Sequence, residues 1–254
     1  MGQNQLMLGG ASAFNHAVHA LTSDEVKDIT STAVGWEADL PWAAKTLLIS
    51  PDPRDYLITP VPIMYSDLPN RNGFAFPLAE LTAWNVQLGR QAYAGWKGMP
   101  MYTEHRSDDH KKALGMVVDV RLRRIERFGK GLFWKVIALA AIDRNKDAKR
   151  AEQMEQGLVD TFSMGAMVEY CSCSYCGAVA GKCSHVPASN EEVCFYKLNG
   201  RLVYKNVHGV SPYELSVVND PAYGTAMSTV RLSYEGDTLI RVNPNVDMMS
   251  DGLG

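Results

Sequence analysis

Two strand-like segments separated by a glycine-rich turn occupy residues 115–142, and they constrain the fold more than any other part of the chain. Side chains alternate between the two faces of a strand. Residues 115–124 follow that period and are predicted to place on one face Met116, Val118, Val120 and Leu122. Residues 128–131 are typical of a turn, and residues 132–142 are mostly apolar, as expected for a more deeply buried partner strand. The sequence therefore predicts a long antiparallel hairpin.

Weaker signals predict the other elements. Residues 145–156 show helical spacing of apolar side chains, and Gly157 suits the end of that helix. Prolines between residues 41 and 62 are typical of loops and edge strands. Further strands are predicted at residues 158–169, in a hairpin around Asn199-Gly200 at 195–204, and, as a last short strand, at 214–218. Together these signals favour an α+β fold, a mostly antiparallel sheet or closed β-barrel with helices packed outside it.

Composition and charge narrow the functional class. Of the 254 residues, 46% are hydrophobic, which is enough for one large core. The formal net charge of -3 gives no general attraction to nucleic acid. The longest apolar run, residues 136–142, is far shorter than the ~20 residues that span a bilayer, and residues 1–15 show no signal-peptide pattern. Five cysteines, four of them within residues 171–183, are atypical of a secreted disulfide framework. We therefore expect a cytoplasmic protein without a nucleic-acid or membrane partner.

Ser163 is the candidate nucleophile. In an extended strand it would share a face with Thr161 and Gly165, and these small residues leave room for another chain above the strand. A serine hydroxyl needs an adjacent base, usually a histidine that a third group orients. His105, which follows an apolar run and precedes a polar loop, is the best candidate for that base. The alternative is a strand serine and a solvated histidine without catalytic roles.

Two other kinds of site fit the residues around this pair less well. The serine is not flanked by the Gly-x-Ser-x-Gly motif, which argues against an α/β-hydrolase. Asp108, Asp109 and His110 lie close to His105 and could form a metal site, but they lack the zincin spacing. A polar loop accounts for these three residues more simply.

A compact set of metal-ligating side chains follows the serine, namely Cys173, Cys176, Cys183 and His185. Three thiolates and one imidazole suit tetrahedral zinc, and four protein ligands leave no open coordination position. We therefore predict a structural zinc in the loop at residues 171–185, with Cys171 outside the coordination shell and Cys194 as a core thiol. A group of free buried thiols is the alternative.

The order of these motifs resembles that of the tailed-phage prohead proteases, also called capsid maturation proteases. The resemblance spans residues from about 74 to 226, and the ordered set is more specific than any single motif. The matching segments are Phe74-Ala75-Phe76-Pro77-Leu78, Trp96-Lys97-Gly98-Met99-Pro100-Met101-Tyr102-Thr103-Glu104-His105, Phe162-Ser163-Met164-Gly165 and Glu214-Leu215-Ser216-Val217-Val218-Asn219-Asp220-Pro221-Ala222-Tyr223.

This resemblance implies a serine endopeptidase whose fold is similar to herpesvirus assemblin, a closed barrel ringed by helices. Ser163 matches the family nucleophile and His105 matches its histidine. Glu214, on the strand that follows in the family order, is the preferred third member, with Asp160 and His208 as alternatives. Asp160 is an odd number of residues from Ser163, which would place it on the opposite face of the strand.

Some phage members of this family carry a similar cysteine and histidine insertion after the serine strand. The zinc would then pin a loop between that strand and the hairpin at 195–204. The resulting domain prediction is an N-terminal extension at residues 1–35, a protease-like barrel at 36–242 with the zinc loop 171–185 inserted, and a C-terminal tail at 243–254.

The resemblance also implies the partners and the compartment. The substrates would be scaffold protein, arms of the capsid protein and the protease itself, cleaved inside the assembling prohead in the host cytoplasm, and the enzyme is expected to be a homo-oligomer. A non-catalytic capsid or portal-vertex protein on the same fold is the alternative. A zinc-dependent nucleic-acid-binding module is disfavoured, because the loop has a single Lys or Arg, Lys182, and is followed by Glu191 and Glu192.

Overall fold

The computed structural model describes residues 21–31, 36–125, 133–223, 226, 228, 231–235 and 238–241. Its helices are α2 (Ser23–Ser31), α3 (Leu40–Leu47), α4 (Leu78–Thr82) and α5 (Ala148–Glu155), with short 3-10 turns that include η3 (Ala92–Trp96) and η4 (His110–Lys112). Its strands are β1 (Tyr56–Tyr65), β2 (Phe74–Ala75), β3 (Trp84–Asn85), β4 (Arg90–Gln91), β5 (Pro100–Thr103), β6 (Gly115–Ile125), β7 (Phe133–Asp143), β8 (Phe162–Met167), β9 (Tyr170–Cys173), β10 (Tyr196–Leu198), β11 (Arg201–Val203), β12 (Lys205–His208), β13 (Ser211–Val217), β14 (Leu232–Glu235) and β15 (Thr238–Arg241). The expected turn at 128–131, the tail at 243–254 and the first 20 residues of the expected extension lie outside the described residues.

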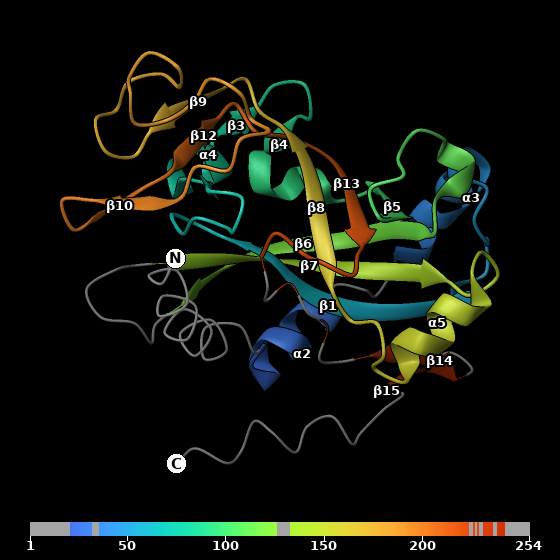
Figure 1. Cartoon of the computed structure of the whole chain (residues 1–254). Helices are drawn as coiled ribbons and strands as arrows, with labels where there is room; N and C mark the ends of the chain where they lie inside the picture. The colour runs from blue at the N-terminus through green and yellow to red at the C-terminus, as the bar shows by residue number, and fades with distance from the viewer. Residues whose placement is uncertain are drawn as a thin grey trace, which may run out of the picture.

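A curled sheet of eight strands forms the body of the molecule, in the order β15-β14-β1-β7-β6-β5-β13-β8 (Figure 1). Its centre is the predicted hairpin, in which β6 and β7 pair antiparallel from Gly115↔Ile142 to Ile125↔Phe133. Neighbouring strands are antiparallel except β5 and β13, which are parallel. The mixed α+β class and the predominance of strands are therefore confirmed, and none of the described helices is long and apolar enough to cross a membrane.

The predicted closure into a barrel is wrong. The sheet is open, because β8 and β15 stand at its two ends. The chain that follows β13 accounts for this opening: the N–H of Phe162 donates to the carbonyl of Ala226 at 2.7 Å, and the N–H of Ser228 donates to the carbonyl of Asp160 at 2.7 Å. The outward-facing backbone groups at the start of β8 are thus satisfied by a non-strand segment, and β8 forms no ladder with β1.

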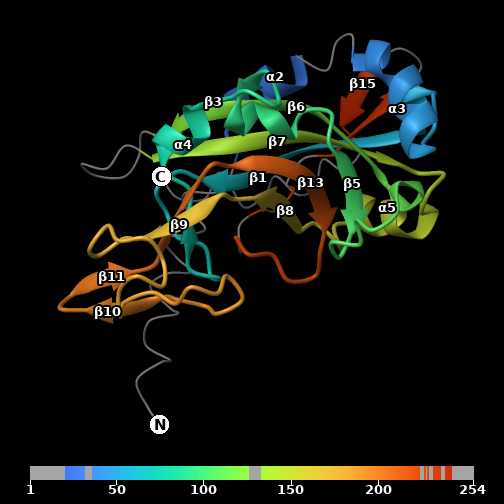
Figure 2. The same ribbon diagram turned by 90° about the horizontal axis from the view of Figure 1, so that it is seen from above.

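Two apolar cores lie on the two faces of the sheet. The larger core includes Val117, Ala140 and Phe162. The second core includes Ile58, Met116 and Ala141, and α2 and α3 cover it on the other side of the sheet (Figure 2). Because both faces of the central strands are buried, residues 136–142 form a continuous apolar run rather than an alternating one.

A smaller lobe carries the cysteines. It contains the three-stranded sheet β2-β12-β9 and the hairpin β10–β11 (Figure 1, upper left). The hairpin turns at Asn199 and Gly200, whose φ angles of 49° and 78° suit the Asn-Gly pair, so the hairpin prediction is confirmed. β9 follows β8 after two residues, so the lobe is joined directly to the strand that carries Ser163.

Candidate functional site

His105 and Glu214 are in direct contact. The imidazole Nδ1 of His105 lies 2.8 Å from Oε1 of Glu214. His105 follows β5 in a turn where it and Glu104 adopt left-handed φ angles of 56° and 49°, so the chain bends sharply as the strand ends. Glu214 lies on β13, next to β5, and its side chain is fully buried, whereas that of His105 is 45% exposed. The preferred acid and the candidate base are therefore hydrogen-bonded.

Ser216 supports both members of this pair. Its hydroxyl donates to Oε2 of Glu214 at 2.5 Å and accepts the backbone N–H of His105 at 3.2 Å. Ser216 was not among the predicted site residues, although the strand period offered a signal, because residues two apart on a strand share a face with each other. Both oxygens of the buried carboxylate thus have partners, which offsets the cost of burying its charge.

Ser163 lies on the same face as this pair. On β8 it pairs with Ser216 of β13, and Gly165 pairs with Glu214. Directly opposite residues of an antiparallel pair project to the same side of a sheet. The preceding residue, Phe162, packs into the larger core. Side chains alternate along a strand, so Ser163 faces away from that core, and the exposed fraction of Ser163 is 8%. The fold therefore joins His105, in the turn after β5, to Glu214 of β13 and places Ser163 of β8 on the same face as Glu214, while no described hydrogen bond joins Ser163 to His105.

Gly165 makes room for the buried acid. A Cβ atom at this position would lie 2.2 Å from Oε1 of Glu214 and 2.6 Å from Cζ of Tyr213. The close approach of the carboxylate to the backbone of β8 therefore requires glycine. Tyr213 lies beside the same carboxylate, and burial together with the charge of Glu214 raises the pKa of its phenol.

The electrostatics of the site favour a protonated imidazole. The hydrogen bond that Nδ1 of His105 donates to Glu214 is the largest cause that raises the pKa of His105 above its usual value of 6.5. Burial opposes that shift, while the charges of Glu214 and Glu104 add to it. A histidine with a raised pKa is a stronger base, but less of it is neutral at pH 7.

The alternative third members lie elsewhere. The carboxyl pKa of Asp160 is raised by burial against the opposing charge of Arg231, and its carbonyl bonds to Ser228. His208 is hydrogen-bonded to Glu80 and Ser172. In the described contacts neither residue meets His105, so Glu214 is the acid that the geometry supports.

Among the described residues, Asp108, Asp109 and His110 in the polar loop after His105 are not part of a cluster that could hold a metal ion. Asp108 pairs with Lys112 at 2.8 Å, and the carboxylate of Asp109 accepts the N–H of Lys111 at 2.9 Å at the start of η4. His110 Nδ1 lies 3.4 Å from the hydroxyl of Tyr102. These contacts fit the interpretation of the segment as a polar loop.

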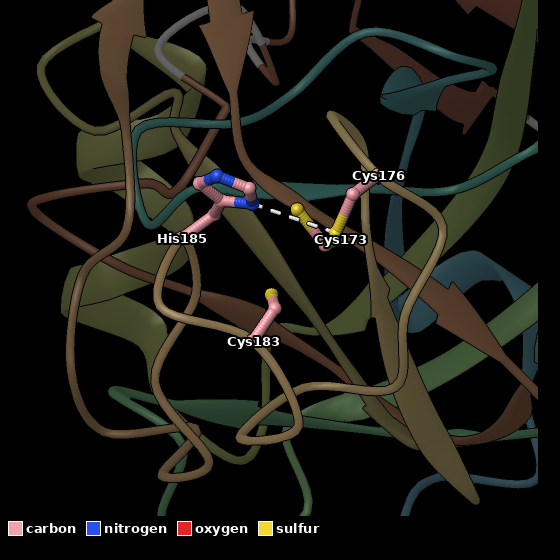
Figure 3. Close-up of side chains that lie close together, drawn as sticks. All are labelled: Cys173, Cys176, Cys183 and His185. Carbon is pink, nitrogen blue, oxygen red and sulfur yellow. Dashed lines mark hydrogen bonds between the residues drawn. The ribbon is translucent and has the colours of Figure 1, made fainter.

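A second site is formed by the four predicted metal ligands. The ligand atoms of Cys173, Cys176, Cys183 and His185 all lie within 4.8 Å of one another, and Figure 3 shows the four side chains converging. His185 Nδ1 is 3.4 Å from the sulfur of Cys176. Two glycine turns fold the loop back, with φ of 76° at Gly177 and 77° at Gly181. The cluster could hold a metal ion.

The remaining cysteines lie outside this cluster. Cys171 is buried in the larger core, with its sulfur 3.8 Å from Oδ1 of Asn190. Cys194 is buried in a small core with Cys173, Val186 and Val203. Beneath the loop a buried lysine, Lys205, donates from Nζ to the carbonyls of Ser189 and Glu192 and so fixes the segment that follows the ligands.

Comparisons of this chain with family models, with curated proteins and with solved structures found no match. One face offers a hydroxyl, an imidazole and a buried carboxylate, which is the set required for nucleophilic acyl transfer. The lobe offers three thiolates and one imidazole that could hold a metal ion.

Proposed function

We propose that the protein is a serine endopeptidase in which Ser163 is the nucleophile, His105 the general base and Glu214 the acid that orients it. The observation that carries this proposal is the 2.8 Å contact between His105 and the fully buried Glu214, on the same face as Ser163. A buried carboxylate bonded to a half-exposed histidine fixes the ring at the edge of solvent, where a peptide can reach it.

In the proposed reaction Ser163 Oγ attacks the peptide carbonyl carbon, and its proton passes to Nε2 of His105. Glu214 keeps Nδ1 protonated and stabilises the imidazolium that forms. The imidazolium then gives its proton to the leaving amine, and the acyl-enzyme is hydrolysed by water. Ser216 keeps the Glu214 carboxylate in place throughout.

The resemblance to tailed-phage prohead proteases supports the choice of substrates. We take these to be scaffold protein, capsid-protein arms and the protease itself, cleaved within the prohead in the host cytoplasm by a homo-oligomer. The motifs that carry the resemblance include the ones that form the site, the segment ending in His105 and the strands that contain Ser163 and Glu214.

We also propose that the metal of the lobe is zinc, in a structural role. The donor set of three thiolates and one imidazole favours zinc over the harder cations. Because four protein ligands complete the tetrahedron, the ion would hold the lobe together and would take no part in peptide cleavage. The site would fix the geometry of the segment that follows β8 and β9.

Two experiments test the proposed endopeptidase. The full chain should react with a fluorophosphonate probe at Ser163, as mapped by peptide mass spectrometry, and Ser163→Ala and His105→Ala should abolish that label. Ser163→Ala should also stop self-cleavage and cleavage of co-expressed capsid protein, while its melting temperature stays close to that of the unaltered chain. Undiminished processing by Ser163→Ala would overturn the protease assignment with Ser163 as its nucleophile.

A further inference from the structure

A second group of serine, histidine and glutamate lies in the smaller lobe, outside the proposed active site. The hydroxyl oxygen of Ser172 is 2.8 Å from Nε2 of His208, and Nδ1 of His208 is 2.8 Å from Oε1 of Glu80. Ser172 belongs to β9, His208 to β12 and Glu80 to α4. Three segments far apart in the sequence are thus joined through one imidazole ring.

Contacts besides the two hydrogen bonds within this group fix the positions of its members. In the antiparallel pair of β9 and β12, Ser172 is opposite Asn206 and Tyr170 is opposite His208, so all four project from the same face. The ring of Tyr170 stacks on His208 at 4.5 Å with an interplanar angle of 10°. The second oxygen of Glu80 accepts the N–H of Gly209 at 3.0 Å.

The direction of the hydrogen bonds follows from this arrangement. With Glu80 ionised, Nδ1 of His208 must donate, and the neutral ring then has only an acceptor at Nε2. The hydroxyl of Ser172 therefore donates to Nε2. This is the orientation in which a histidine removes the proton of a serine nucleophile while a carboxylate stabilises the resulting imidazolium.

We propose that Ser172 is a second nucleophile, activated by His208 and Glu80, which takes acyl groups from esters. Ser172 Oγ bonds to the ester carbonyl carbon as its proton moves to Nε2 of His208. The bond from that carbon to the leaving oxygen then breaks, and the leaving oxygen takes the proton from Nε2. The acyl group remains on Ser172 until water, deprotonated by the same imidazole, releases it as a carboxylic acid.

An adjoining cavity indicates the class of ester. A cavity of about 280 Å³ adjoins the group at Glu80, although Ser172 and His208 do not line it, and its lining also includes Gly209, Glu169, Trp84 and Asn85. The described residues of its walls provide two carboxylates and an aromatic ring, and none of them is a lysine or an arginine. Such a lining attracts positive charge, so the preferred substrates carry a cationic group on the acyl side.

Ser174 provides a matched control within the same segment. Its hydroxyl donates to the carbonyl of Leu202 at 3.3 Å and accepts the N–H of Tyr204 at 2.9 Å, and it lies two residues from Ser172. Both serines are half-buried in the same lobe. Any difference in their reactivity therefore reports activation by His208 rather than accessibility alone.

The test uses the full, metal-loaded chain with Ser163→Ala, so that the proposed protease site cannot react. A fluorophosphonate probe should label Ser172 at least about 100-fold faster than Ser174, because a positioned general base contributes about 10²–10⁴ in rate. His208→Gln should remove most of that advantage, and p-nitrophenyl esters with an ammonium group should be hydrolysed faster than anionic ones.

The outcomes separate the two sites. Labelling of Ser172 no faster than that of Ser174 would overturn the second nucleophile, and this comparison needs no variant in the group itself. An unchanged rate in a folded His208→Gln chain would overturn it as well, and a preference for anionic esters would refute the assigned substrate class. Labelling of Ser163 in the unaltered chain is read from a different peptide, so failure of the protease proposal would be visible independently.

Discussion

Replacing Gly165 with alanine tests the proposed active site directly, because an added Cβ would come closest to the carboxylate of Glu214. That Cβ would lie 2.2 Å from Oε1 of Glu214, whereas ordinary van der Waals contact begins near 3.4 Å. The carboxylate must therefore retreat by about 1 Å, which lengthens its 2.8 Å contact with His105 beyond hydrogen-bond range.

The size of the effect follows from that displacement. A misplacement of about 1 Å in a catalytic group costs on the order of 10²-fold in rate, which corresponds to about 2.7 kcal/mol in the activation barrier. We expect Gly165→Ala to slow both the fluorophosphonate labelling of Ser163 and self-cleavage by that factor. The pKa of His105, followed by NMR, should fall back toward 6.5 because its strongest partner has moved.

Two further variants make the comparison sharp. Ala166→Gly changes one methyl group at the neighbouring position, on the opposite face of β8, and should leave the labelling rate within about twofold. In a Glu214→Asp background, where the carboxylate is one methylene shorter, Gly165→Ala should cost much less than in the unaltered chain, because the two residues are in contact. A Gly165→Ala protein with normal labelling rate and an unshifted His105 pKa would refute the whole geometry of the site.

Three other predictions follow from the same contacts. Glu214→Gln should lower the cleavage rate by about 10³–10⁴-fold with little loss of folding, since the imidazolium loses its counter-charge. A time course of self-cleavage would measure this loss, and full activity would contradict the role of Glu214. The rate of cleavage should rise with pH through a midpoint above 6.5, because His105 must be neutral to act as the base. The contribution of the His105–Glu214 pair to folding stability should be complete below pH 6.5 and lost as pH rises through the raised pKa of His105. A midpoint of the rate at or below 6.5 would argue against the pairing. Elemental analysis should find about one zinc per chain, and chelation should lower the melting temperature and increase hydrogen exchange in the lobe that contains Cys173 and His185; zinc-free protein with an unchanged lobe would rule the metal out.

The strand period was the reliable guide to both fold and site. It predicted the β6–β7 hairpin, and its parity argued against Asp160, whereas the preference for Glu214 came from the order of strands in the family that the chain resembles; Glu214 pairs with Gly165, two residues from Ser163. The strand period could also have indicated Ser216. Spacing could not reveal contacts between distant segments, such as those of His208 with Glu80 and Ser172, since nothing in a local pattern encodes them.

The prolines of residues 41–62 indicated loops and edge strands, and this range holds a loop at 48–52 but also most of α3 and the start of β1. Pro41 lies in the first turn of α3, where a missing N–H costs nothing. Pro60 and Pro62 lie within β1, a strand in the interior of the sheet order, but β1 pairs with β14 only at Ile58↔Leu232. Beyond that position the side of β1 facing away from β7 has no described ladder partner, so the prolines remove no ladder hydrogen bond there.

The open edge of the sheet was equally beyond the sequence. Residues 214–218 were expected to form the last strand, yet β14 and β15 follow them and extend the sheet at its far end, next to β1. Between β13 and β14, Ala226 and Ser228 form backbone hydrogen bonds with Phe162 and Asp160 at the start of β8. A closed barrel would need β8 to pair along its free side, and the contacts at Phe162 and Asp160 occupy the start of that side.

The lobe and the proposed active site share one continuous stretch of chain, and this sets how they can influence each other. β8 carries Ser163, β9 carries Cys173, and only Val168 and Glu169 separate the two strands. The N–H of Glu169 donates to the carbonyl of His208 at 2.9 Å, which ties that junction to β12. β13, which carries Glu214, also follows β12 of the lobe after only two residues, Gly209 and Val210, whereas His105 lies in the turn after β5. Glu214 is three residues inside β13 and pairs there with Gly165 of β8. Loss of metal should therefore disturb first the ends of β8 and β13 that join the lobe, and the raised pKa of His105 should survive chelation even where cleavage slows.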